Sequence, residues 1–165
     1  MIIRDALAMA AALAVTLGSA VAGEQTEKAV TIVNAWARAT PAGATVGAAY
    51  LDVRMGGTGD RLIGVASPVA GRAELHSHSD ENGVMRMRRL EAVAIRSGEA
   101  HAFVPGGDHI MLFDLKEPLH EGGSVPLTLS FERAGDITVE APIIAIGAQG
   151  PASSVAPTAG GTHEH

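Results

Sequence analysis

Residues 125–140 read VPLTLSFERAGDITVE, and this stretch decides the fold class. Apolar side chains stand at every second position on both sides of Gly135, namely Leu127, Leu129, Phe131, Ile137 and Val139. Strict alternation of this kind is typical of strands with one buried and one solvated face. We therefore predict half-buried strands on both sides of this glycine.

Similar short segments recur through most of the chain. Further strands are predicted at residues 46–53, 61–67, 72–78, 84–90, 92–96, 100–104 and 109–113. Gly, Pro, Asn and Asp separate them, as turns require. One more strand near the start should place Val30, Ile32 and Trp36 on one face. About nine or ten short strands, with no amphipathic helix after residue 23, indicate an all-β domain, an antiparallel Greek-key β-sandwich.

The two ends differ in composition from this patterned region. Arg4, an apolar run over residues 6–17 and small residues up to Ala22 are typical of a signal peptide, and the run is shorter than the ~20 residues that span a bilayer. We predict a signal peptide at 1–22, one domain at 23–144 and a disordered tail rich in Ala, Gly and Pro at 145–165. The mature protein is expected to be exported, with no stable membrane insertion.

Charge and missing motifs exclude several classes of function. The chain has 12 Lys and Arg against 18 Asp and Glu, a net charge of −6 that argues against a nucleic-acid partner. It has no Cys, which excludes thiolate sites and blue-copper electron transfer. No Gly-x-Ser-x-Gly or His-Glu-x-x-His motif and no evident acid/base pair is present, so we expect no enzyme.

Soft metal donors are abundant. There are 7 His and 6 Met, most of them between residues 76 and 120. Imidazole and thioether together favour copper, and thioether tilts the preference towards Cu(I). His163 and His165 in the tail could bind Cu(II) weakly.

The spacing of these donors predicts a site. His109 and Met111 flank Ile110 in a predicted strand, so both side chains emerge on the same face, about two rises of roughly 3.3 Å apart. The preceding glycines, 106 and 107, permit a tight turn at the strand's start. His76 and Met87, from neighbouring strands, could complete a set of four neutral donors, which suits a monovalent ion.

Each of these residues also has a plain structural interpretation. Met85, Met87 and Met111, taken singly, would more often fill gaps in a core. His101 and His120 are interpreted as surface or hydrogen-bonded residues. His78 lies on the same face as His76 and is a candidate auxiliary donor.

The series His76, ten residues, Met87, twenty-one residues, His109, one residue, Met111 resembles the ligand signature of the periplasmic PCu(A)C copper chaperones. The segments AWARAT at 35–40, GAAY at 47–50 and GDHIML at 107–112 are similar to that family as well. The resemblance covers roughly residues 32–143. It implies a cupredoxin-like β-sandwich whose metal ligands are His76, Met87, His109 and Met111.

The resemblance also implies a function. A periplasmic Cu(I) metallochaperone would carry one copper ion to a partner such as the Cu(A) site of cytochrome c oxidase, an oxidase subunit or its assembly factor. A copper buffer, storage or resistance protein would use the same ligands. A non-metal Ig-like interaction module, with Met in the core and His incidental, is the remaining alternative.

Overall fold

The computed structural model describes residues 30–151, and the predicted signal peptide and the histidines of the tail lie outside this range. Ten strands succeed one another: β1 (Val30–Arg38), β2 (Val46–Met55), β3 (Asp60–Ala66), β4 (Ala70–Glu81), β5 (Val84–Leu90), β6 (Val93–Ile95), β7 (Ala100–Phe103), β8 (Asp108–Leu115), β9 (Ser124–Phe131) and β10 (Gly135–Ile144). Between residues 30 and 151 there is no helix, and hence none that could cross a membrane. The all-β prediction is confirmed.

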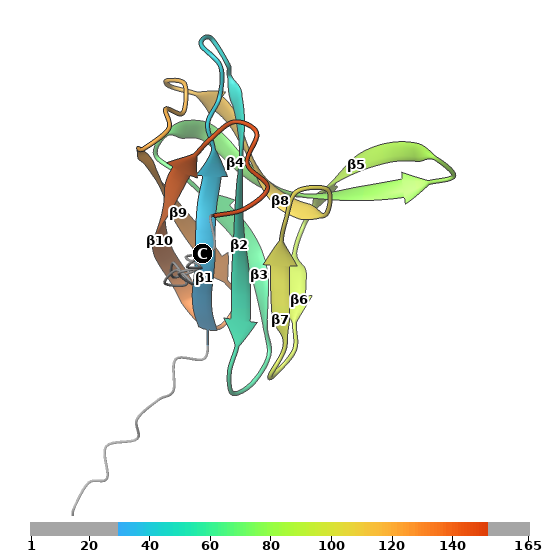
Figure 1. The fold of residues 1–165 in the computed structure, drawn as a ribbon. Helices are drawn as coiled ribbons and strands as arrows, with labels where there is room; N and C mark the ends of the chain where they lie inside the picture. The colour runs from blue at the N-terminus through green and yellow to red at the C-terminus, as the bar shows by residue number, and fades with distance from the viewer. Residues whose placement is uncertain (1–29, 152–165) are drawn as a thin grey trace, which may run out of the picture.

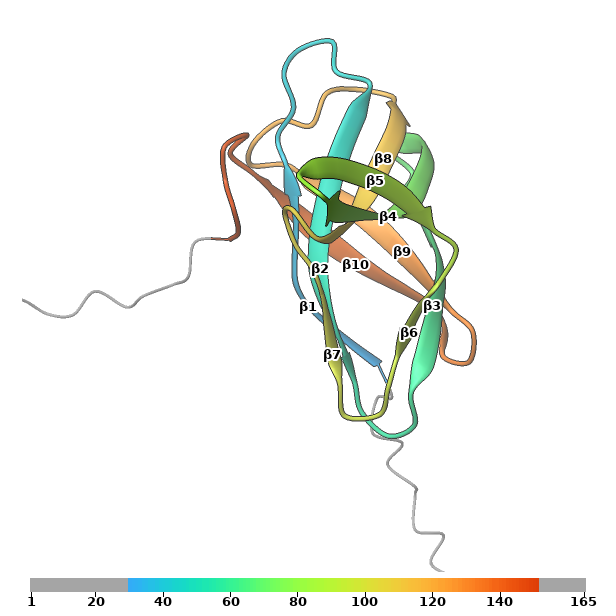
Figure 2. The same ribbon diagram turned by 90° about the vertical axis from the view of Figure 1, so that its right-hand side faces the viewer.

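The strands form two packed layers (Figures 1 and 2). Their hydrogen-bonded order is β5-β4-β8-β2-β1-β10-β9-β3-β6, with β7 paired to β2. One layer contains β5, β4, β8, β2 and β1, and the other contains β10, β9, β3 and β6. The layers are joined where β1 and β10 run parallel, with Ala37 opposite Ile143, and every other pairing is antiparallel.

The core lies between the layers and consists mostly of aliphatic side chains. The residues that alternate in the 125–140 stretch face inward as predicted, and Leu127 and Leu129 are fully buried. Leu51, Ile110 and Leu112 meet them from the other layer. Burial of such side chains contributes roughly 1.5–3 kcal/mol each, which lets the domain fold without disulfides.

The prediction that Val30, Ile32 and Trp36 share a face is wrong. The register between β1 and β2 shifts between Val33 and Trp36, next to Asn34, whose φ is +53°. This β-bulge inserts an unpaired residue and reverses the facing of the residues after it. Trp36 therefore stacks on Tyr50, with ring centroids 4.3 Å apart, on the face of the first layer that points away from the core.

β4 and β5 together extend beyond the body of the sandwich as a hairpin arm (Figure 1). β5 is the edge strand of its layer and pairs only with β4 among the described strands. Most of β5 is exposed. The candidate site lies where this arm leaves the body.

Candidate metal centre

Strand register brings the predicted donors together on one face. His76 is directly opposite His109 on β8, and His78 is directly opposite Met87 on β5. Side chains of directly paired residues emerge on the same face of a sheet, and so do residues two apart in one strand. His76, His78, Met87, His109 and Met111 therefore share the outer face of the first layer.

A shallow cavity of about 190 Å³ lies on this face. Three of the four ligands predicted from the sequence, Met87, His109 and Met111, line it, and His78 is the imidazole that joins them there. The ring of His78 is 4.9 Å from that of His109, measured between centroids, whereas the ring of His76 is 6.1 Å away and lies outside the cavity lining. His78, predicted only as an auxiliary donor, is thus nearer to His109 than His76 is.

The turn before β8 holds His109 in place. The carbonyl of Gly107 accepts a hydrogen bond from Nδ1 of His109 at 2.9 Å and another from the backbone N–H of His78 at 3.2 Å. Gly106 has φ +81°, a conformation that favours glycine, which explains why a glycine stands at this position. Since a carbonyl only accepts, Nδ1 of His109 carries the proton and Nε2 keeps its lone pair.

The surroundings of His109 also favour its neutral form. It is 4% exposed, and this burial is the main cause of a pKa below the ordinary value. The hydrogen bond to Gly107 acts in the opposite direction, and the neighbouring His78 and His76 lower the pKa further. A neutral imidazole is the form that binds a metal ion.

Two further imidazole nitrogens lack partners. Nδ1 of His76 and Nδ1 of His78 are buried and make no hydrogen bond within the described residues. Buried polar atoms are rarely left unpaired, because each costs about 1–3 kcal/mol. A soft metal ion held by nitrogen and sulfur would satisfy such atoms, so the residues present fit copper.

The methionines of the arm are not core residues. Met87 is 49% exposed and Met85 is 61% exposed, whereas Met55 is 3% exposed and belongs to the core. Met111 is half-buried, at the cavity. The core interpretation therefore fails for Met85 and Met87.

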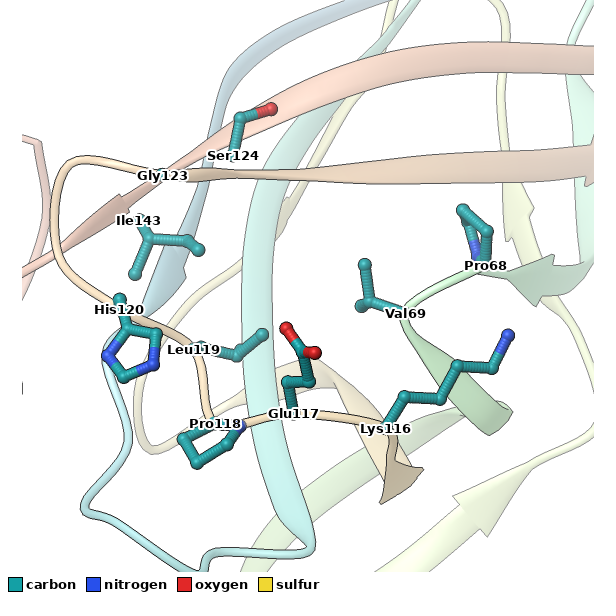
Figure 3. Close-up of a pocket in the computed structure, with 10 residues that line it drawn as sticks. All are labelled: Pro68, Val69, Lys116, Glu117, Pro118, Leu119, His120, Gly123, Ser124 and Ile143. Carbon is teal, nitrogen blue, oxygen red and sulfur yellow. The ribbon is translucent and has the colours of Figure 1, made fainter.

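The other two described histidines have the roles expected for them. Nε2 of His101 lies 2.9 Å from Oδ2 of Asp108, so this histidine is hydrogen-bonded. His120 is exposed and lines a separate groove of about 460 Å³ between residues 68–69, 116–120, 123–124 and Ile143 (Figure 3). That groove has one imidazole and no thioether, which is a poor donor set for copper.

Sequence reasoning missed several neighbours of the centre. Arg38 and Tyr50 line the cavity, and the Arg38 guanidinium carbon lies 5.5 Å from the Tyr50 ring centroid and 5.8 Å from that of Trp36. Arg38 also donates from Nη2 to the carbonyl of Ala148, at 2.8 Å. The bulge in β1 puts Trp36 and Arg38 on this face, and no period-2 pattern could have revealed it.

The donors gathered on this face include thioethers as well as imidazoles. Among residues 30–151, no group of three or more His, Asp and Glu side chains is placed to hold a metal ion by itself. The candidate site therefore combines imidazole with the thioethers of Met87 and Met111, which line the same cavity.

An exposed sheet face carrying imidazole and thioether donors, on an all-β sandwich, defines a cupredoxin-like domain with a candidate soft-metal centre. The family model described as "Putative lipoprotein LpqE-like" matches residues 30–143, and the chain belongs to this LpqE-like family. The "Putative lipoprotein Lxx21020" of Leifsonia xyli subsp. xyli is 34% identical over 116 residues, which cover 69% of each chain.

Solved structures confirm the fold class. A copper-bound PCuAC domain from PmoF2 superposes with a TM-score of 0.61 and 29% identity, over 71% of this chain and 93% of that domain. The Cu(I) form of DR1885 from Deinococcus radiodurans gives a TM-score of 0.53 and 27% identity, over 74% of this chain and 83% of the other. The domain therefore has the fold of PCuAC domains.

Proposed function

We propose that this protein is a periplasmic Cu(I) chaperone, which binds one copper ion and delivers it to a partner such as the Cu(A) site of cytochrome c oxidase. The observation that carries the proposal is the convergence of His109, Met111 and Met87 on one exposed cavity. The ligands we assign are His76, Met87, His109 and Met111, with His78 as an auxiliary donor. The copper-bound state of the PmoF2 domain and the Cu(I) state of DR1885 support the choice of metal.

The donor chemistry suits a carrier. Two imidazoles and two thioethers are all neutral, so a bound Cu(I) keeps a single positive charge. Thioethers do not form disulfides, and a chain without Cys remains competent where thiols are oxidised. The half-exposed Met87 leaves the ion accessible to an incoming ligand of the acceptor.

The location and organisation belong to the same proposal. Residues 1–22 direct export and are removed after Ala22, and residues 23–144 form the copper-binding domain. The tail begins at Ala145, where residues 145–148 make a turn closed by a hydrogen bond from Ala148 to Ala145. The acceptor is a copper-accepting protein, in our proposal an oxidase subunit or its assembly factor.

Two methionines of the arm provide a matched pair of variants. Met87→Leu is expected to weaken Cu(I) binding at least about tenfold, because it removes a thioether from the cavity. Met85→Leu should bind as the wild type does, since Met85 is opposite Asp80, further out on the arm. Competition with a chromogenic Cu(I) chelator under anaerobic conditions measures both. Equal affinities in the two variants would refute a role for Met87.

Acidification should weaken binding in part. Cu(I) affinity is expected to fall between about pH 7 and pH 5, because protons compete for imidazole near its ordinary pKa of about 6.5 while thioethers do not titrate. Because the pKa of His109 is lowered, protonation of this residue should weaken Cu(I) binding only towards the acidic end of the range. The same competition assay at a series of pH values measures the effect. A flat profile would exclude His76 and His109 as joint ligands.

Delivery is tested by transfer. The mature chain, residues 23–165, should bind one tight equivalent of Cu(I) and pass it to an apo acceptor domain carrying a Cu(A) site. Transfer should be faster than spontaneous release to a chelator, because the acceptor's ligands enter while the chaperone's leave. Transfer no faster than release would identify a buffer or storage protein. If the chain binds no tight equivalent of Cu(I) at all, the non-metal Ig-like interaction module is the remaining interpretation.

A further inference from the structure

Glu74 makes an unusual set of contacts beside the centre. It lies two residues before His76 on the same face of β4, and its side chain is 11% exposed. Oε2 of Glu74 is 2.9 Å from Nε2 of His76. Oε1 is 3.2 Å from Nε of Arg72 and 3.6 Å from Nη1 of Arg89. One largely buried carboxylate thus joins an imidazole and two guanidinium groups.

The contact with His76 determines which ring nitrogen carries the proton. An ionised carboxylate can only accept hydrogen bonds, so Nε2 of His76 must donate. In the neutral imidazole the lone pair is then on Nδ1, the atom that is buried and unpartnered within the described residues. His109 is the reverse case, because Gly107 takes its Nδ1 proton and leaves Nε2 free.

We propose that Glu74 is a positioning residue that holds His76 in the Nε2-protonated tautomer, so that His76 presents Nδ1 to the cargo while His109 presents Nε2. The identity of the cargo rests on the proposed function, but the tautomers are set by the contacts of the metal-free protein. Hydrogen bonding of a ligand's second nitrogen to a carboxylate fixes ring orientation and raises ligand basicity.

The two arginines keep the carboxylate in place. Arg72 is anchored over the ring of Phe113, at 4.7 Å from guanidinium carbon to centroid, and that ring is 5.8 Å from the ring of His76. Arg89 is directly opposite His76 on β5, two residues after Met87. Glu74 therefore connects the imidazole on β4 to the strand that carries the thioether.

The tautomers can be measured directly in metal-free protein. Long-range proton–nitrogen NMR correlations on histidine-labelled mature chain, at about pH 8 where imidazoles are neutral, distinguish the two forms. We expect the Nε2-protonated pattern for His76 and the Nδ1-protonated pattern for His109. Glu74→Ala should give His76 a mixture of tautomers and leave His109 unchanged. Glu74→Gln, which can both donate and accept, should give an intermediate mixture.

Copper binding provides the second readout. Glu74→Ala should lower Cu(I) affinity by about 10–100-fold, the usual effect of losing such a partner. Glu132→Gln is the control, because that carboxylate pairs with Arg61 on the other layer, at 3.6 Å, and should change neither readout.

Two results would overturn the proposal: an Nδ1-protonated His76 in the wild type, or a His76 tautomer that does not respond to either Glu74 substitution. If the wild-type tautomers are as expected but Cu(I) does not bind, the positioning role is supported and the chaperone function is refuted.

Discussion

Replacing His109 with alanine is expected to lower Cu(I) affinity by at least about 100-fold, beyond the roughly 10–100-fold typical of losing a residue that only hydrogen-bonds to a ligand. His109 is the imidazole nearest the middle of the donor set. It lines the cavity with Met87 and Met111, and its ring is near those of both His76 and His78. The hydrogen bond from its Nδ1 to Gly107 leaves the Nε2 lone pair free to bind a metal ion.

A matched histidine separates loss of a ligand from loss of stability. His101→Ala removes an imidazole from β7 that is hydrogen-bonded to Asp108, the residue just before His109. It should keep Cu(I) affinity within about threefold, because its Nε2 is occupied by the carboxylate. Anaerobic competition titrations and thermal melts of both variants make the comparison. Comparable losses in the two variants would contradict a direct role for His109.

Asp60→Ala is expected to lower the free energy of unfolding by about 2–4 kcal/mol, because three part-buried backbone N–H groups would lose the acceptor that the buried Asp60 carboxylate provides. Asp60 is 8% exposed and begins β3. Its carboxylate accepts from the backbone N–H groups of Arg61 at 2.7 Å, Arg133 at 3.1 Å and Ala134 at 2.8 Å. These bonds fasten the turn between β9 and β10 to β3. Urea denaturation of each variant measures the difference.

Titration of the same carboxylate should make the stability of the fold depend on pH in the acidic range. Burial alone would raise the pKa of Asp60, but the three backbone hydrogen bonds and the charge of Arg133 together lower it below its ordinary value. A lowered folded-state pKa contributes stability that is present above the unfolded value, about 3.9, and is lost as the pH falls through the folded value. The wild type should therefore weaken below about pH 4.

Asp60→Asn removes this titration and should give a shallower loss of stability over the acidic range than the wild type. Asp136→Asn is the control, because Asp136 is exposed and accepts one hydrogen bond, from Ser130. Acid profiles of unfolding by circular dichroism compare the three proteins. Parallel profiles for wild type and Asp60→Asn would show that Asp60 contributes nothing to acid sensitivity.

The local pattern of the chain was enough to predict most of the strands. Predicted segments such as 84–90 and 46–53 match β5 and most of β2, because Gly, Pro, Asn and Asp mark the turns that bound them. The pleat of a strand, with its period of two residues, put His109 and Met111 on one face. The set of four candidate ligands came from spacing and family resemblance and remains a prediction, now joined by His78 at the cavity.

The sequence by itself determined the class of fold and the types of donor available, because hydrophobic period and ligand chemistry are properties of neighbouring residues. Only the tertiary structure decided which donors meet. Register between β4, β5 and β8 brought His78 to Met87 and His76 to His109, and a single bulge moved Trp36 to the outer face. The environments of Glu74 and Asp60 depend on the same pairing, since their partners come from other strands and turns. Pairing register and bulges arise from contacts between distant segments, which no local pattern contains.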